Sequence, residues 1–129
     1  MEADLRGALS SKQFHLVFQP LIAAKTQKLI GFEALIRWNH PKRGLVPPNA
    51  FIPVAEEIGL MPDIGAWVID EACKAAASWP EAISVSLNVS PKQIVLPALP
   101  NIVSEALGRH KVQGNRIELE VTEGVFLGD

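Results

Sequence analysis

Hydrophobic and polar residues alternate along this chain in two ways: with a period of two in short runs, and with a longer period elsewhere. The short runs are rich in β-branched and aromatic residues and predict strands at 14–19, 29–38, 83–89 and 117–122. The longer stretches place apolar residues three or four positions apart, which predicts helices at 3–11, 49–58, 63–79 and from 91 to about 110, with breaks at Pro97 and Pro100. The segment 39–48 is rich in proline and glycine and predicts a loop.

Several single residues indicate where these elements begin or end. Pro20 has no backbone N–H to donate, so we expect it to end the first strand. Gly59 offers a left-handed cap to the helix at 49–58. Ser90 and Gln93 have the spacing of a capping box, which predicts a helix starting directly after the third strand.

From the second strand onward, strands and helices alternate, which is typical of a parallel sheet. A closed (β/α)8 barrel needs eight such units and about 200 residues or more, whereas the 129 residues here hold four predicted strands. The pattern therefore predicts an α/β fold that forms part of a parallel barrel. An open doubly wound sheet is the alternative, although no glycine-rich phosphate loop follows any predicted strand.

The second strand carries charged residues among apolar ones. Side chains two positions apart share a face of a strand, so Glu33, Leu35 and Arg37 should point the same way. Charged groups are costly to bury unless they are paired. An ion pair between Glu33 and Arg37 is one explanation of the pattern, and a functional site is the other.

Polar residues also occur near the ends of the next two strands. Asn88 ends the third strand, where it would either cap the following turn or serve a site. Glu118 and Glu120 share a face of the fourth strand, and Glu118 has the alternative of pointing into water. We expect Glu33, Asn88 and Glu120 to bring oxygen ligands near the carboxyl ends of three strands, where barrel enzymes build their sites. All-oxygen ligation suits Mg²⁺ or Mn²⁺ rather than Zn²⁺.

Composition narrows the class of protein. A net charge of -2 and the absence of tyrosine argue against a duplex or single-stranded nucleic-acid binder. The sequence has no apolar run of the ~18 residues that cross a bilayer and no signal-peptide pattern. The single cysteine, Cys73, excludes an internal disulfide and is expected to be a buried filler of the third helix. We therefore expect this chain to be cytoplasmic, either by itself or as part of a larger membrane-associated protein.

Five segments in order resemble the EAL domain family, bacterial phosphodiesterases that linearise cyclic di-GMP to pGpG. They are FQP at 18–20, GFEALIRWNHP at 31–41, FIPVAEEIGL at 51–60, SLNVSPKQ at 86–93 and ELEVTE at 118–123. The resemblance implies a TIM-type barrel whose first strand runs antiparallel to its neighbour. Residues 1–129 would then be a partial EAL domain, its N-terminal half.

The resemblance also implies two divalent cations, Mg²⁺ or Mn²⁺, and roles for particular residues. It implies metal ligation by Glu33, Asn88 and Glu120, substrate binding by Gln19, Leu35 and Arg37, and anchoring of a mobile loop by Glu123. For Arg37 the implied partner is a substrate phosphate, and the fork of guanidinium donors suits that task.

Beyond ELEVTE the family continues to an Asp-Asp-Phe-Gly segment and to a later lysine, glutamate and glutamine. These have no counterpart here, since Asp129 follows Gly128 and does not match the pair. We therefore expect the 129 residues alone to be catalytically incomplete. A non-catalytic cyclic di-GMP-binding module and a protein-interaction module are the alternatives. The first helix resembles one that often follows an upstream GGDEF, PAS or receiver domain, so such a domain is one expected partner. A second copy of the chain and cyclic di-GMP are the others.

Overall fold

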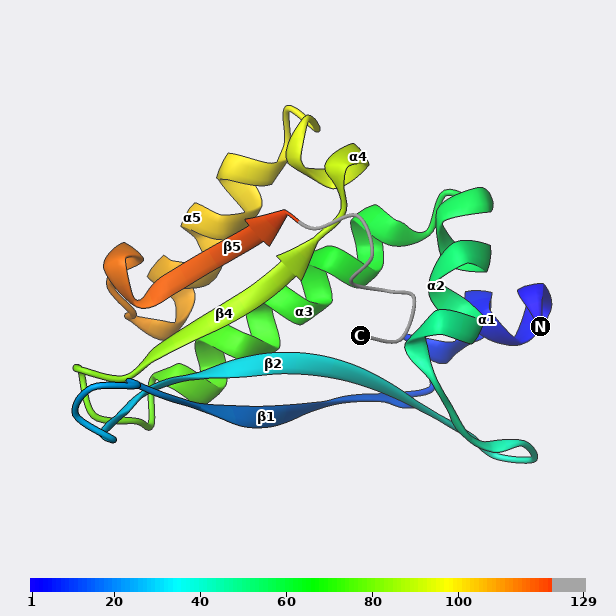
Figure 1. The fold of residues 1–129 in the computed structure, drawn as a ribbon. Helices are drawn as coiled ribbons and strands as arrows, with labels where there is room; N and C mark the ends of the chain where they lie inside the picture. The colour runs from blue at the N-terminus through cyan, green and yellow to red at the C-terminus, as the bar shows by residue number, and fades with distance from the viewer. Residues whose placement is uncertain (122–129) are drawn as a thin grey trace.

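A computed structural model describes residues 1–121 as one twisted sheet with helices packed on one of its faces (Figure 1). The strands are β1 (Phe14–Ile22), β2 (Leu29–His40), β3 (Gly44–Val46), β4 (Ser84–Val89) and β5 (Ile117–Val121). The helices are α1 (Glu2–Ala8), α2 (Pro48–Glu57), α3 (Met61–Ala76), α4 (Pro91–Ile94) and α5 (Leu99–His110), and a short 3-10 turn, η1 (Gly114–Arg116), precedes β5.

The strand order is β1-β2-β4-β5, and β3 pairs with the end of β2. β1 runs antiparallel to β2, whereas β2, β4 and β5 run parallel to one another. The parallel arrangement predicted from the alternating pattern is therefore confirmed, as is the antiparallel first strand. Helix α3 lies between β2 and β4 along the chain, and α4 and α5 lie between β4 and β5.

The prediction that Pro20 ends the first strand was wrong. β1 continues through Pro20, which lies opposite Phe32, and ends at Ile22. Among residues 1–121, β1 pairs on one side alone, at the edge of the sheet. An edge strand tolerates proline because the missing N–H can lie on the side without a neighbouring strand.

The segment expected to be a loop, 39–48, contains the short strand β3. Two interactions turn the chain back on itself there. The Nδ1 of His40 accepts hydrogen bonds from the backbone N–H groups of Lys42 and Arg43, both at 3.0 Å. Gly44 then adopts a φ of 75°, a left-handed conformation that favours glycine. β3 consequently pairs with the end of β2.

The expected helix from 91 to about 110 is divided into α4 and α5. The capping box at its start is confirmed: Ser90 and Gln93 exchange both side chain-to-backbone hydrogen bonds. The break falls around Pro97, as expected, but Pro100 lies in the first turn of α5, where a missing N–H costs no helical hydrogen bond. The left-handed conformation expected after α2 is also confirmed, with a φ of 77° at Gly59.

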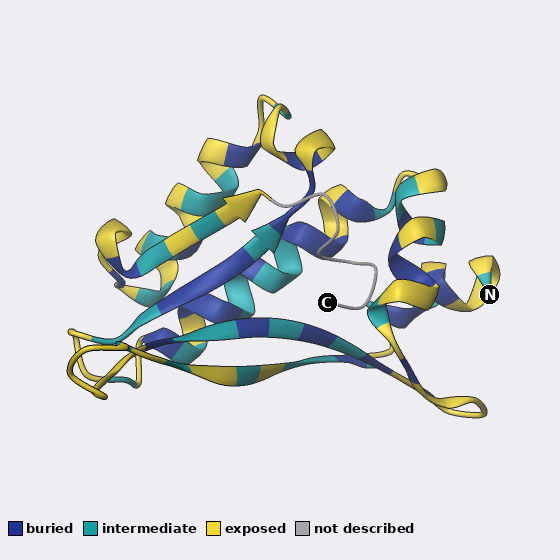
Figure 2. Ribbon diagram, viewed as in Figure 1, coloured by how far each residue is buried: buried dark blue, intermediate teal, exposed yellow. Residues whose placement is uncertain are grey.

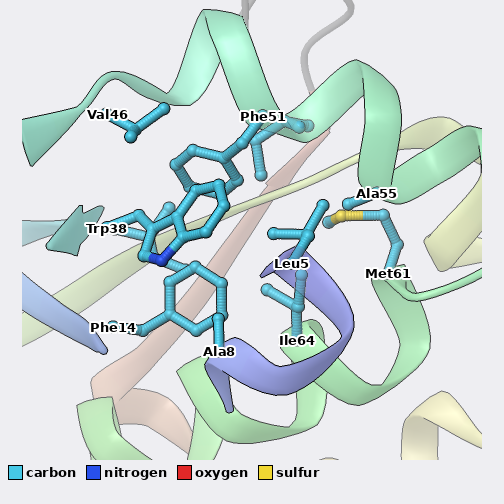
Figure 3. Packing of buried hydrophobic residues seen from close by; sticks show 11 residues of the cluster. Leu5, Ala8, Phe14, Trp38, Val46, Phe51, Ala55, Met61 and Ile64 are labelled. Carbon is cyan, nitrogen blue, oxygen red and sulfur yellow. The ribbon is translucent and has the colours of Figure 1, made fainter. Parts of the chain in front are cut away.

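Two hydrophobic clusters hold the helices on the sheet. One joins α1, α2 and the start of α3 to β1–β3, with the buried indole of Trp38 beside the rings of Phe14 and Phe51 (Figure 3). The other joins α3 and α5 to β2 and β4. Cys73 belongs to the second cluster and is fully buried, which confirms its expected role as a filler. Among the strands, Figure 2 shows most burial in β2 and β4, with β5 more exposed.

A buried arginine, Arg116, closes the C-terminal end of α3. Its guanidinium donates hydrogen bonds to the backbone carbonyls of Ala76, Pro80 and Ile83, at distances of 2.7 to 3.1 Å. The last carbonyls of a helix have no partner within the helix and carry partial negative charge, so a cation there is favourable.

Candidate functional site

The two faces of β2 have different surroundings. Ala34 and Ile36 are buried in the two hydrophobic clusters. Glu33, Leu35 and Arg37 alternate with them and are half-buried. Because successive side chains of a strand point to opposite faces, these three residues share the face turned away from the helices, as the sequence predicted.

The side chains of Glu33 and Asn88 meet on this face. The Nδ2 of Asn88 donates a hydrogen bond to the Oε2 of Glu33 at 2.9 Å, although 55 positions separate the two residues in the sequence. The parallel pairing of β2 with β4 makes this contact, because Glu33 lies opposite Ser86, two residues before Asn88. Since the amide nitrogen is the donor, its oxygen Oδ1 keeps its acceptor capacity for another group.

Glu120 completes the three expected ligands on the neighbouring strand. In the parallel pair of β4 and β5, the Cα atoms of Asn88 and Glu120 are direct partners, and the Glu120 side chain is exposed. The part of the chain described here holds no group of three or more histidine, cysteine, aspartate or glutamate residues spaced for a metal ion. The set is instead two carboxylates and one amide, an oxygen donor set that fits part of a shell of Mg²⁺ or Mn²⁺.

The expectation that all three residues lie near the carboxyl ends of their strands was wrong for Glu33. Asn88 and Glu120 each precede the last residue of β4 and β5. Glu33 lies inside β2, which runs on to His40 because β1 and β3 both continue to pair with it. The site is thus built at the ends of two strands and the middle of a third.

The alternative of an ion pair between Glu33 and Arg37 is not supported. Within residues 1–121, that pair is absent from the salt bridges, and Glu33 is bonded to Asn88 instead. The Nη1 of Arg37 donates to the backbone carbonyl of Ile36 at 2.9 Å. The guanidinium carries five N–H donors in all, so it retains others for a ligand.

Two further expected residues lie near this site. Gln19 of β1 is the direct Cα partner of Glu33 and is exposed on the edge strand. Leu35, Arg37 and Asn88 border a cavity of about 60 Å³, whose lining otherwise comes mostly from the helix side of the sheet, including Ile52, Ile64 and Val68. Glu123, expected to anchor a loop, lies outside the described residues.

Two residues of the face were missed in the sequence. Ser86 is 3% exposed, and its hydroxyl donates to the Oε2 of Glu118 at 3.4 Å. Gly31 lies so close to β4 that a Cβ on it would be 2.6 Å from the carbonyl oxygen of Ser84. The signal for Ser86 was its position two residues before Asn88 on the same face, whereas the close approach at Gly31 has no signal in the sequence.

The structure contains no helix, among those it describes, with the length and hydropathy of a membrane span.

Comparison with known proteins gives a consistent assignment. The family model described as EAL domain matches residues 2–129. An "Uncharacterized signaling protein" of Caulobacter vibrioides is 44% identical over 126 residues, which cover 98% of this chain and 16% of that protein. The bifunctional diguanylate cyclase/cyclic di-GMP phosphodiesterase MucR of Pseudomonas aeruginosa is 40% identical over 130 residues, which cover 98% of this chain and 19% of MucR.

A solved structure agrees with these matches. The PaMucR phosphodiesterase in complex with c-di-GMP has a TM-score of 0.89 and 41% identity to this chain, and the match covers 94% of this chain and 51% of the other. The chain therefore spans about half of that solved protein and less than a fifth of the two curated relatives. The expected fold class, part of a TIM-type α/β barrel, is confirmed by this likeness. The chain belongs to the EAL domain family.

Proposed function

We propose that this chain is part of a phosphodiesterase domain that hydrolyses cyclic di-GMP to pGpG with Mg²⁺ or Mn²⁺. The observation that carries the proposal is the contact between Glu33 and Asn88, with Glu120 beside Asn88 on the next strand. These three residues match, position by position, the metal ligands implied by the family resemblance. They lie on the face turned away from the helices, where Glu33 and Asn88 are half-buried and Glu120 is exposed.

In this proposal Glu33, Asn88 and Glu120 hold a divalent cation. When bound, such a cation polarises a phosphoryl oxygen and lowers the pKa of a water. The chain's own contribution is to supply two carboxylates and to orient the amide oxygen of Asn88, whose nitrogen is already occupied by Glu33.

Three other residues would bind the substrate. Arg37 would donate to a phosphate oxygen from the N–H groups that do not bond Ile36. Gln19 lies beside Glu33 on β1 and would contact the nucleotide there, and Leu35 would pack against it. Glu123 keeps its proposed role of anchoring a loop.

The test is hydrolysis of cyclic di-GMP by the full-length gene product, with pGpG detected by chromatography. We expect turnover with Mg²⁺ or Mn²⁺ and none with EDTA. Glu33→Gln removes a charged ligand and should lower kcat/KM by about 100-fold or more. Glu105→Gln is the matched control, because Glu105 is exposed on α5, away from the sheet.

Two results would contradict the proposal. Unchanged metal-dependent hydrolysis in Glu33→Gln would refute the assigned site. Binding of cyclic di-GMP that persists in EDTA without pGpG would point to a non-catalytic binding module. We expect residues 1–129 alone to give no turnover, because the family's Asp-Asp pair and lysine have no counterpart in them.

The proposed partner is cyclic di-GMP, and the proposed location is the cytoplasm. A flanking GGDEF, PAS or receiver domain, or a second copy of the chain, would supply regulation. The MucR relative supports the first of these, because its name couples a diguanylate cyclase to a cyclic di-GMP phosphodiesterase in one protein.

A further inference from the structure

Gly65 of α3 and Gln93 of α4 lie in unusually close contact behind the end of β4. Both are buried, and Gln93 is 4% exposed. A Cβ on Gly65 would lie 2.3 Å from the Nε2 of Gln93, far inside van der Waals contact. The side chain of Gln93 therefore occupies the space that any other residue at position 65 would need.

The oxygen of the Gln93 amide is hydrogen-bonded to the backbone of the turn that follows β4. Its Oε1 accepts a hydrogen bond from the backbone N–H of Ser90 at 2.9 Å. The Ser90 hydroxyl accepts in return from the backbone N–H of Gln93 at 3.2 Å. Ser90 is 3% exposed, so water does not easily replace these bonds. Asn88 lies two residues before Ser90, at the next-to-last position of β4.

A cavity of about 60 Å³ adjoins this contact, and its lining includes Gly65, Asn88 and Gln93. A Gln93 amide displaced by a larger residue at position 65 could move into this cavity. A methyl group at position 65 would then disturb the capping box and the end of β4 without forcing the helices apart. Fold and site can thus be separated by experiment.

We propose that Gly65 and Gln93 are a positioning pair that holds the side chain of Asn88 toward Glu33 and toward a bound cation. The inference rests on the proposed function, since it concerns the same site. In this proposal the backbone of Gly65 leaves room for the Gln93 amide, and the Gln93 amide fixes the backbone of Ser90. Ser90 directly follows β4 and thereby fixes the end of the strand that carries Asn88. Residues that orient a metal ligand contribute strongly to affinity without touching the metal.

The test is direct Mn²⁺ binding to the full-length gene product, followed by the electron paramagnetic resonance signal of free Mn²⁺. We expect Gly65→Ala to weaken binding roughly 10- to 100-fold. Gly108→Ala on α5 is the matched control, because a Cβ there meets nothing within 4 Å. Both changes replace a helical glycine by alanine, so helix propensity alone predicts the same effect for both.

A double-mutant cycle identifies the contact responsible. Gln93→Ala should also weaken Mn²⁺ binding, because it removes one half of the capping box. Adding Gly65→Ala to that variant should cause no further loss, since the amide it would displace is gone. Losses that simply multiply in the double variant would overturn the pairing of Gly65 with Gln93.

A spectroscopic readout without metal completes the design. The side-chain amide resonances of Asn88 should shift in Gly65→Ala and stay in place in Gly108→Ala. If Glu33→Gln leaves Mn²⁺ affinity unchanged, the proposed function fails. If Glu33→Gln abolishes binding while Gly65→Ala behaves like Gly108→Ala, the positioning pair is refuted and the proposed function stands.

Discussion

The side-chain amide of Asn88 donates a hydrogen bond to the carboxylate of Glu33 at 2.9 Å and so ties β4 to β2 on the polar face of the sheet. A neutral donor at this position satisfies one carboxylate oxygen without adding a second negative charge. Ionised acids at the same distance would repel each other. The pairing thus lets two neighbouring strands present oxygen atoms together in the absence of a cation.

Asn88→Asp tests this relationship. The change replaces a donor by a second carboxylate beside Glu33, so we expect the metal-free protein to melt several degrees lower at neutral pH. Mn²⁺ should restore most of the loss, because a cation neutralises the added charge. Thermal melting with Mn²⁺ and with EDTA measures both effects.

Asn101→Asp is the control for that change, because Asn101 is exposed in the first turn of α5. A negative charge near a helix N-terminus is favourable, so its melting temperature should hold or rise slightly. Equal destabilisation by the two substitutions would show that the contact of residue 88 with Glu33 does not determine the loss of stability in Asn88→Asp.

Removing the guanidinium of Arg116 should destabilise the fold more than most surface changes. Arg116→Met removes the guanidinium donor from the carbonyls of Ala76, Pro80 and Ile83, the first two of which keep a backbone N–H donor, and we expect a loss of about 1–3 kcal/mol. The midpoint of urea unfolding gives this loss. Arg6→Met, which removes an exposed pair with Glu2, should change the midpoint by less than about 1 kcal/mol.

Asp70 should make stability depend on pH in the acid range. Partial burial favours its protonated form, but hydrogen bonds from His110 and Arg109 outweigh burial and hold the pKa of Asp70 below its usual 3.8. Ionised Asp70 therefore stabilises the folded state above that value, and the contribution disappears as the pH falls through the lowered pKa. Asp70→Asn should cost about 0.5–1 kcal/mol near pH 7.

The same comparison at low pH checks the sign of this effect. As the pH falls further below 3.8, the difference in unfolding midpoint between wild type and Asp70→Asn should shrink. A difference that grows as the pH falls would show that Asp70 does not stabilise the fold through its charge.

Cys73 should be unreactive in the folded protein. Burial raises the pKa of its thiol to about 11, so almost no thiolate, the nucleophilic form, is present at pH 8. Iodoacetamide should therefore leave native Cys73 unmodified and label it fully in urea, as mass spectrometry can show. Rapid labelling of the native protein would mean that α3 opens readily.

Local features of this fold could be read from the sequence, because neighbouring residues determine them. The capping box of Ser90 and Gln93 needs just four consecutive residues, and the left-handed Gly59 follows a recognisable helix. The alternation of strands and helices likewise predicted the parallel order. The shared face of Glu33 and Arg37 followed from the period of a strand.

Features that depend on pairing between distant segments could not be read in this way. The prediction that Pro20 ends β1 failed because β1 is an edge strand, which tolerates proline. The position of a strand at the edge depends on the whole sheet and not on the residues around Pro20. The strand β3 depends on a turn organised by the His40 ring, which has no periodic signal. The contact of Asn88 with Glu33 requires the register of β2 against β4, which neither segment contains by itself.

The close approach of Gly31 to Ser84 has a consequence for insertions and deletions in this protein. If β4 slid by one residue along β2, a residue with a side chain would take the place of Gly31 opposite Ser84. The backbone of β4 leaves no room for a Cβ there. The slip would also turn every side chain of the slipped strand to the opposite face. With Gly31 held against Ser84, adding or removing one residue between Gly31 and Glu33 should turn the Glu33 carboxylate to the opposite face of β2, among the helices. The turn at 23–28, outside both paired strands, can absorb extra residues while the ligand stays on the polar face.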